Sequence, residues 1–340
     1  VVKNHPNADA LNRLIYEFVA AIEKKELELW QQGKRISLEL LKNMLTTQEN
    51  NSSFISFFKQ EVTNSSLKNS TKRNHLSTLM LLQEFKKDIT FSDLTFEFVS
   101  SFEYFLQLKG YHTNTIAKHM KHLKRHVNIA INKEYIEIQK YAFRKYKIKT
   151  VENKHTHLVP EELEKLEKLN LSGRYMKLQK SLDAFLFCCY AGMRYSDFTN
   201  LSSENIVDIN QETWLIYKSV KTGTEVRLPL YLLFAGKGII ILNKYRDNLE
   251  GFFRLRDNSN VNKDLLTLAK LAGLSKNISF HTARHTNATL LIYNGVNITT
   301  VQKLLGHKSV KTTQVYTNIM DMTIIHDLEK MKQATPFAGK

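Results

Sequence analysis

Two stretches near the end of the chain gather side chains that can bind or attack a phosphate. The first, FHTARHTNATLL at 280–291, places His281, Arg284 and His285 within five positions. The second, LLGHKSVKTTQVYTNI at 304–319, contains His307 and Tyr316. Three interpretations compete for these residues: a metal site, a phosphate site, or the polar side chains of an ordinary surface.

A metal site is the least supported of the three. His281 and His285 are four residues apart, a spacing that can hold zinc on one face of a helix. The glutamate that acts as general base in a metalloprotease is absent, and no cluster of Cys or Asp accompanies the pair. We therefore expect no metal here.

A phosphate site has more support. Arg284 lies at the start of an expected helix, one turn after His281, and a helix N-terminus adds backbone N–H groups and partial positive charge. Arg194 follows a glycine that ends one helix and precedes another. Two guanidinium groups can each donate two hydrogen bonds to phosphate oxygens. Lys221 lies at the tip of an expected hairpin, within reach of a phosphate ester. Each of these residues, taken alone, is more often a surface charge.

Tyr316 is the candidate nucleophile. The segment VNITTVQKLLGH reads as an amphipathic helix that ends at Gly306, with His307 at the turn and a further short helix from Thr312. A phenol with a pKa near 10 is a weak nucleophile. Packed among cations it can lose its proton and attack phosphorus. A surface hydroxyl remains the ordinary interpretation, as for most of the 14 tyrosines.

Composition favours a globular protein with a polyanionic partner. A length of 340 residues indicates two domains, with three allowed. The net charge is +16, which a polyanion such as nucleic acid would neutralise. No run of 18 apolar residues exists, so we expect no membrane span. The adjacent Cys188 and Cys189 read as reduced core residues of an intracellular protein. The chain does not begin with Met, so we expect further sequence upstream.

Hydrophobic periodicity predicts mostly helices with one small antiparallel sheet. The expected elements are a long helix at 8–31, four or five helices within 54–147, a helix beginning at Pro160, a hairpin at 213–230, and helices from about 237 onward. Polar stretches at 46–53 and 148–158 read as linkers.

The helix near 113–132 carries much of the positive charge. From Tyr111 to Thr150 the chain has ten Lys or Arg and two acidic residues, which is half of the total excess. Lys118, Lys121, His122 and Arg125 are expected to share one face, because they follow three- and four-residue steps. A short run of charge is usually a solvated face, but this run is long and of one sign. We predict that it contacts DNA.

The ordered blocks resemble those of the tyrosine recombinases, of the lambda-integrase or phage-integrase type. The resemblance is carried by AGMRYSDF, KSVKTGTEVRLPL, FHTARHTNAT and LLGHKSVKTTQVY, in the order Arg, Lys, His-x-x-Arg, His, Tyr. It covers about 155–320 closely. All six positions are filled, so a chance match is very improbable.

The resemblance implies a role for each residue. Arg194 and Arg284 would hold the scissile phosphate, and His307 would add a hydrogen bond to it. Lys221 would be the general acid for the departing 5′-oxygen. Tyr316 would form a 3′-phosphotyrosyl link.

Two further residues take supporting parts in this scheme. His281 would bond to the phosphate as well and assist proton transfer from the tyrosine. Asp197, three residues after Arg194, would orient its neighbours, although an ordinary charge at a helix start is an equal interpretation.

The resemblance also implies an organisation and partners. Residues 1–47 would be the tail of an N-terminal arm-binding domain, as in integrases of mobile elements from Bacteroides-type bacteria. Residues 48–148 would be a helical, SAM-like core-DNA-binding domain, and 149–340 the catalytic domain with a C-terminal tail. Double-stranded DNA, a tetramer on two DNA sites and an accessory DNA-bending or directionality protein would be the partners. No cofactor and no membrane would be involved, and the location would be cytoplasmic, at the nucleoid.

Several activities share these residues. Integration of a mobile element is favoured by the arm-like N-terminus, while DNA inversion and chromosome-dimer resolution remain open. A type IB topoisomerase also forms a phosphotyrosine but only relaxes supercoils.

An apolar stripe in the tail at 322–337 favours the multi-subunit recombinase, because in this family such a tail often docks on a neighbouring subunit. Packing of the tail on its own domain is the alternative. The complete residue set argues against a regulator without catalysis.

Overall fold

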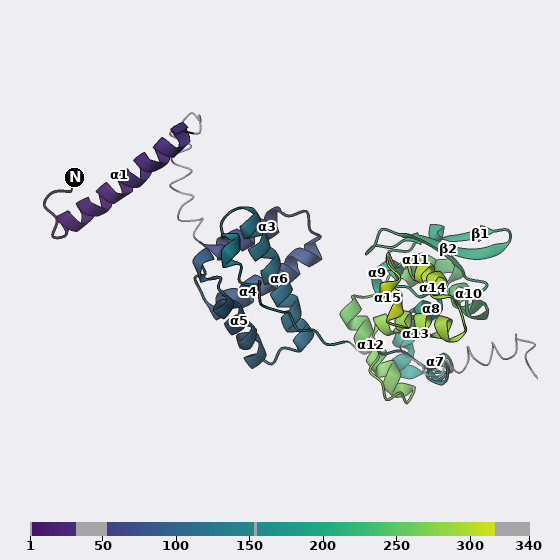
Figure 1. Cartoon of the computed structure of the whole chain (residues 1–340). Coiled ribbons are helices and arrows are strands. Elements are labelled where there is room, and N and C mark those ends of the chain that lie inside the picture. Colours follow the sequence, from purple (N-terminus) through teal and green to yellow (C-terminus); the bar gives the residue numbers. More distant parts are fainter. Residues whose placement is uncertain (1, 32–52, 153–154, 317–340) are drawn as a thin grey trace, which may run out of the picture. The chain divides into compact units, whose positions relative to one another are not determined.

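The computed structural model describes residues 2–31, 53–152 and 155–316. They are mostly helical, with one three-stranded antiparallel sheet, as the sequence predicts. The chain divides into two compact units, an N-terminal unit of residues 1–152 and a C-terminal unit of residues 153–340 (Figure 1). The expected tail helix at 322–337 and the linker at 46–53 lie outside the described residues, apart from Ser53.

The first helix, α1 (Ala8–Gln31), confirms the helix expected at 8–31. Several of its apolar side chains are exposed, including Leu14, Phe18 and Trp30.

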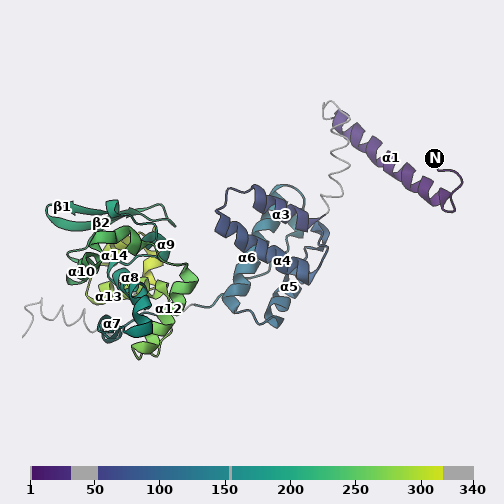
Figure 2. The same ribbon diagram turned by 180° about the vertical axis from the view of Figure 1, so that it is seen from behind.

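Four helices pack around one core between residues 53 and 152 (Figure 2). They are α3 (Phe54–Asn64), α4 (Asn69–Phe85), α5 (Phe96–Leu108) and α6 (Thr113–Asn132), with short 3₁₀ turns at Phe91–Asp93 and Ile138–Lys140. Apolar residues at helical spacing supply the core, and Phe58, Leu82, Phe102 and Val127 are almost completely buried. This agrees with the four or five helices expected from the sequence.

Four histidines pack between α4 and α6. The rings of His75 and His122 are stacked with centroids 3.9 Å apart, and His126 stacks on Phe58 at 3.7 Å. Thr78 Oγ1 lies 2.8 Å from Nδ1 of both His119 and His122. His122 is therefore half-buried against α4, whereas Lys118, Lys121 and Arg125 are exposed. Lys118, Lys121 and Arg125 are exposed on the expected common face, and His122 lies at the edge of that face, where α4 partly covers it.

The C-terminal unit begins with α7 (Pro160–Glu167), as its proline predicts. A 3₁₀ helix at Gly173–Leu178 leads into α8 (Gln179–Ala191), in which every residue from Ser181 to Ala191 is buried. Cys188 and Cys189 are free, as expected for core residues. The remaining helices are α9 (Tyr195–Phe198), α10 (Lys237–Lys244), α11 (Leu249–Phe253), α12 (Asn258–Leu271), α13 (Phe280–Tyr293), α14 (Ile298–Leu305) and α15 (Lys311–Gln314), with 3₁₀ turns at Ser203–Asn205, Leu233–Gly236 and Arg246–Asn248.

The sheet lies at one edge of this unit (Figures 1 and 2). Strands β2 (Glu212–Lys218) and β3 (Glu225–Pro229) form the predicted hairpin, in register from Trp214–Pro229 to Lys218–Glu225. Strand β1 (Ile206–Ile209) adds to β2 through a two-residue turn whose members, Asn210 and Gln211, both have positive φ. That geometry closes a two-residue hairpin with the twist of the strands.

Two left-handed glycines end the helices that precede Arg194 and His307 in the chain. Gly192 (φ +67°) follows α8, and Gly306 (φ +62°) follows α14. Asn287 of α13 donates from Nδ2 to the carbonyls of Cys189 and Tyr190, at 2.9 Å each, and so satisfies the last turn of α8. A Cβ at Gly192 would lie 2.6 Å from Asn287 Oδ1.

Gly192→Ala is expected to lower the free energy of unfolding by more than left-handed strain alone. That strain costs about 1–2 kcal/mol, and displacing Asn287 adds about 1–3 kcal/mol. Gly273→Ala is the matched control, since Gly273 also has a positive φ (+66°) but nothing lies within 4 Å of an added Cβ. Thermal unfolding of both variants measures the difference. Equal losses would show that the contact between α8 and α13 is not tight.

Stability should also fall below pH 6.5, because the histidines of α4 and α6 resist protonation in the folded chain. Burial lowers the pKa of His126 to about 4 and that of His119 to about 4, with Arg125 and Lys118 as further causes. Above pH 6.5 both states are neutral; below it only the unfolded state gains protons, so unfolding becomes easier until the folded pKa is reached.

His126→Phe keeps a ring against Phe58 and removes one titrating group. Between pH 6.5 and 5.0 it should lose about 1 kcal/mol less stability than the wild-type chain. His5→Gln, at an exposed position outside the cluster, is the control. An unchanged pH dependence in His126→Phe would contradict the role of burial.

Candidate active site

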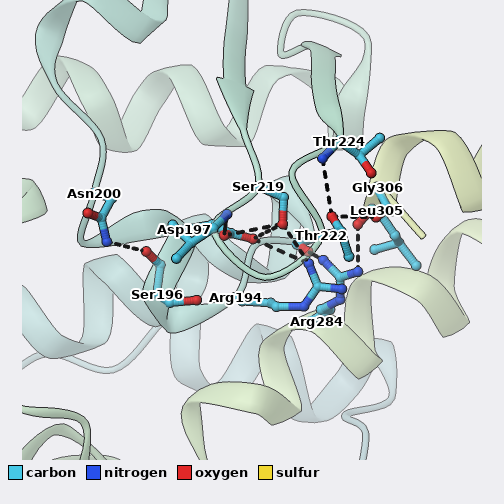
Figure 3. Close-up of polar contacts among 12 residues, drawn as sticks. Arg194, Ser196, Asp197, Asn200, Ser219, Thr222, Thr224, Arg284, Leu305 and Gly306 are labelled. Carbon is cyan, nitrogen blue, oxygen red and sulfur yellow. Dashed lines mark hydrogen bonds and ion pairs between the residues drawn. The ribbon is translucent and has the colours of Figure 1, made fainter. Parts of the chain in front are cut away.

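Arg284 lies at the centre of the site, on the second turn of α13. Its side chain is almost wholly buried, with 1% of the residue exposed. Nη1 donates to the Gly192 carbonyl at 2.8 Å, and Nη2 donates to the Leu305 carbonyl at 2.6 Å (Figure 3). Both acceptors lie at helix C-termini, where the carbonyls carry partial negative charge. Burial, and then Arg194, lower the pKa of Arg284 to about 10, so it stays charged at neutral pH.

Arg194 precedes α9 and remains partly accessible, with 12% of its side chain exposed. Its Nη1 lies 3.1 Å from Ser219 Oγ and 3.4 Å from Asp197 Oδ2. Asp197 is buried and accepts from the Ser219 hydroxyl at 3.2 Å and from the Val220 N–H at 2.9 Å. One carboxylate therefore contacts both the arginine and the hairpin turn (Figure 3).

Lys221 occupies the tip of that turn, between β2 and β3, and is exposed. Its ammonium makes no hydrogen bond or ion pair with any residue that the structure describes. Its charge is among the causes that lower the pKa of His281 and of His307. The lysine therefore acts electrostatically on the same site as the two arginines.

His307 follows Gly306 and is buried. Its Nδ1 lies 2.9 Å from Oγ1 of Thr313, which belongs to the short helix α15. Burial, followed by Arg284, Arg194 and Lys221, lowers its pKa to about 3. The ring is therefore neutral at physiological pH.

Tyr316 follows α15 and is buried, with 6% exposed. Its hydroxyl lies 3.0 Å from Nδ1 of His285, one turn beyond His281 on α13. Burial raises the pKa of Tyr316, and the charges of Arg284 and Arg194 oppose that rise. The phenol is therefore protonated at neutral pH, with an imidazole in hydrogen-bond contact.

The pair His281 and His285 does not have the arrangement of a metal site. Their rings meet edge to face, with centroids 4.5 Å apart, and His155 lies 4.5 Å from His285 on centroids. His281 itself is solvent-accessible. Desolvation and the cations Arg284, Arg194 and Lys221 lower its pKa to about 4. Within the described residues no group of three or more His, Cys, Asp or Glu side chains is placed to hold a metal ion.

The structure thus brings the six predicted residues to one site from five separate segments. Three cations, Arg284, Arg194 and Lys221, act on this site, and its buried carboxylate, Asp197, is already bonded to the hairpin. Such an excess of positive charge suits an anion, and a phosphodiester beside a phenol is open to nucleophilic attack.

The sequence analysis did not identify the contacts that three residues make in the site. Ser219 and Thr222, on either side of the lysine in KSVKTGT, were not singled out, and His285 was considered only as a metal ligand. Hydroxyl residues on both sides of a candidate general acid were the available signal for the first two. For His285 no local signal exists, because its partner Tyr316 is 31 residues away.

The exposed cations of α6 form a separate candidate surface in the N-terminal unit. Lys118, Lys121 and Arg125 are solvent-accessible there. Lys124 is half-buried and lies over the ring of Phe143, 6.0 Å from its centroid.

None of the described helices has the length and apolarity to cross a bilayer.

Comparison with known families gives two matches that together span most of the chain. The profile of the Phage integrase family matches residues 157–322, and that of the Phage integrase SAM-like domain matches residues 53–148. The first match includes all six residues of the site, and the second includes α3 to α6.

Curated relatives are tyrosine recombinases. One from Pseudothermotoga lettingae is 31% identical over 185 residues, covering 52% of this chain and 60% of the relative. The tyrosine recombinase XerD of Oceanobacillus iheyensis is 26% identical over 271 residues, covering 74% of this chain and 86% of the relative. The chain thus spans somewhat less than two thirds of the first relative and most of the second.

Solved structures share the fold at low identity. Lambda integrase, as a tetramer bound to a Holliday junction, has a TM-score of 0.64 at 19% identity, with 93% of this chain and 88% of that chain covered. The Tn1549 transposon integrase, in complex with transposon right end DNA, has a TM-score of 0.64 at 17% identity, with 83% and 99% covered. With both units matched by profiles of one family, the chain belongs to the phage integrase family, that of the tyrosine recombinases.

Proposed function

We propose that the chain is a site-specific DNA recombinase that cleaves and rejoins strands through a 3′-phosphotyrosyl intermediate. The observation that carries the proposal is that Arg194, Arg284 and His307 lie at one site with the buried phenol of Tyr316. The relatives named tyrosine recombinases support it.

In this proposal the two arginines and His307 bind the scissile phosphate and stabilise the charge of its pentacoordinate transition state. His281, at the rim of the site, donates a further hydrogen bond to the phosphate. The Tyr316 oxygen bonds to phosphorus while the bond from phosphorus to the 5′-oxygen breaks. The phenol proton passes to the histidine pair of α13, in which His285 makes the hydrogen bond to it.

Lys221 protonates the departing 5′-oxygen, since an alkoxide leaving group needs a proton. Asp197 takes no part in the chemistry; it orients Arg194 and the hairpin turn through the bonds described above. One phosphodiester is exchanged for another, so the bond energy is retained and religation needs no nucleotide cofactor. The cationic side chains supply the charge stabilisation.

Strand exchange follows when the 5′-hydroxyl of a second duplex attacks the phosphotyrosine. Two exchanges through a Holliday junction require four protomers on two DNA sites. The lambda integrase tetramer bound to a Holliday junction supports this arrangement. Residues 48–148 act as the core-DNA-binding domain, through α6, and 149–340 as the catalytic domain. The enzyme works where DNA is, in the cytoplasm at the nucleoid.

Among the activities of the family we favour integration of a mobile element, of the Bacteroides type, aided by an accessory DNA-bending or directionality protein. The Tn1549 transposon integrase, matched over 83% of this chain, supports this choice. Chromosome-dimer resolution is the second candidate, because XerD is among the curated relatives. Recombination between the ends of a circularised element, compared with recombination between paired chromosomal sites, separates the two. Relaxation of a supercoiled plasmid without any paired site would favour a topoisomerase.

Tyr316→Phe is expected to bind DNA as the wild-type chain does and to form no covalent adduct. The substitution removes only the nucleophilic oxygen and its hydrogen bond to His285. A nicked suicide substrate that traps the adduct, analysed on a denaturing gel, measures it. An adduct formed by this variant would assign the nucleophile to another residue.

Lys121→Glu combined with Arg125→Glu should weaken DNA binding and flatten its salt dependence. Loss of two phosphate contacts reduces the slope of log K against log salt by about 2. Lys59→Glu combined with Lys87→Glu makes the same change of net charge at exposed positions off α6. Equal slopes for the two double variants would leave α6 as an ordinary solvated face.

A further inference from the structure

The turn that carries Lys221 is tied to the rest of the site on both sides of the lysine. Residues 219–224 form a closed loop, in which Ser219 N–H donates to the Thr224 carbonyl at 2.9 Å and Gly223 N–H donates to the Ser219 carbonyl at 2.7 Å. These bonds define the local shape of the turn. They do not by themselves direct it toward the phosphate-binding residues.

The first tie precedes the lysine. Ser219 Oγ donates to Asp197 at 3.2 Å and accepts from Arg194 Nη1 at 3.1 Å, and the Val220 N–H donates to the same carboxylate at 2.9 Å. Ser219 and Asp197 are both buried, so these bonds form out of contact with water. The chain just before Lys221 is therefore bound to the carboxylate that contacts Arg194.

The second tie follows the lysine. The Thr222 hydroxyl donates to the Gly306 carbonyl at 3.3 Å (Figure 3). Gly306 stands between Leu305, whose carbonyl accepts from Arg284, and His307. A Cβ at Gly306 would come within 2.6 Å of Val226 Cγ2 on β3, so the hairpin and the end of α14 are in close contact.

We propose that Ser219 and Thr222 are positioning residues for the general acid. A lysine side chain is flexible, with four rotatable bonds. The entropy cost of bringing its ammonium to one oxygen is smaller when the lysine backbone is already held in place. The two hydroxyls hold that backbone against the elements that bear Arg194 and His307. The lysine and the phosphate-binding residues thus keep one geometry. This inference rests on the proposed function, in which Lys221 protonates the leaving 5′-oxygen.

Thr222 is the better position for a test, because Ser219 also contacts Arg194 and its loss would disturb phosphate binding. Thr222→Val keeps the shape and the β-branch and removes the hydroxyl. Thr222→Ser keeps the hydroxyl. Thr224→Val is the matched control, since the Thr224 side chain makes no hydrogen bond that the structure describes, and only its backbone closes the turn.

The experiment measures single-turnover cleavage of two suicide substrates by the full chain. One has the normal 5′-oxygen leaving group and the other a bridging 5′-sulfur, which leaves without a proton. With oxygen, Thr222→Val should cleave about three- to tenfold more slowly than wild type, the value of one hydrogen bond. With sulfur it should match wild type. Thr222→Ser should recover most of the oxygen rate, and Thr224→Val should match wild type on both substrates.

Lys221→Ala calibrates the assay: it should lose about 100-fold with oxygen and recover with sulfur. In the double variant, Thr222→Val should add nothing to Lys221→Ala, because both remove one function. Equal slowing of Thr222→Val on both substrates, or no slowing with oxygen, would overturn the inference. A wild-type chain that forms no adduct with either substrate would instead refute the proposed function, before any variant is compared. Melting temperatures of all variants separate misfolding from mispositioning, and Thr222→Ala replaces the valine variant if that one unfolds.

Discussion

The site depends on the burial of one charged group, the Arg284 guanidinium. Removing such a group from water is costly unless it is bonded. Its two bonds run to carbonyls at the ends of α8 and α14, at Gly192 and Leu305. Arg194 lies two residues after the first carbonyl, and His307 two residues after the second. A single side chain of α13 therefore joins the three helices and positions the residues that follow two of them.

The electrostatic state of the site follows from the same geometry. Desolvation, and then the charges of Arg284, Arg194 and Lys221, lower the pKa of His281 and of His307, so both rings are neutral. Asp197, which is buried nearby, is bonded to the hairpin turn and to Arg194. The site thus has an excess of positive charge. An anionic phosphodiester relieves that repulsion, which couples binding of the substrate to completion of the catalytic arrangement.

Sequence patterns indicated much of this arrangement. The helix ends at Gly192 and Gly306 and the β2–β3 hairpin could be predicted, because each depends on local periodicity or on turn residues. The convergence of the motifs was expected only from the family resemblance. Strand β1 was missed, since four residues show little alternation. The half-burial of His122 against α4 was not predicted, because helical spacing alone does not reveal which face a neighbouring helix covers.

Long-range contacts were beyond prediction for a related reason. Thr222 bonds to a carbonyl 84 positions away, and Arg284 to one 92 positions away. Nothing in the local sequence specifies such a partner. The near-complete burial of Arg284 was likewise unexpected, because an arginine in a polar motif reads as a surface side chain.

Identification of the residue and strand end joined in the covalent intermediate tests the central claim most directly. The wild-type chain, trapped on a nicked recombination site, is digested with protease and nuclease, and the nucleotide-bearing peptide is sequenced by tandem mass spectrometry. The account predicts a nucleotide joined through its 3′-phosphate to Tyr316. The account would be contradicted by a nucleotide on any of the other 13 tyrosines, or by one joined through a 5′-phosphate.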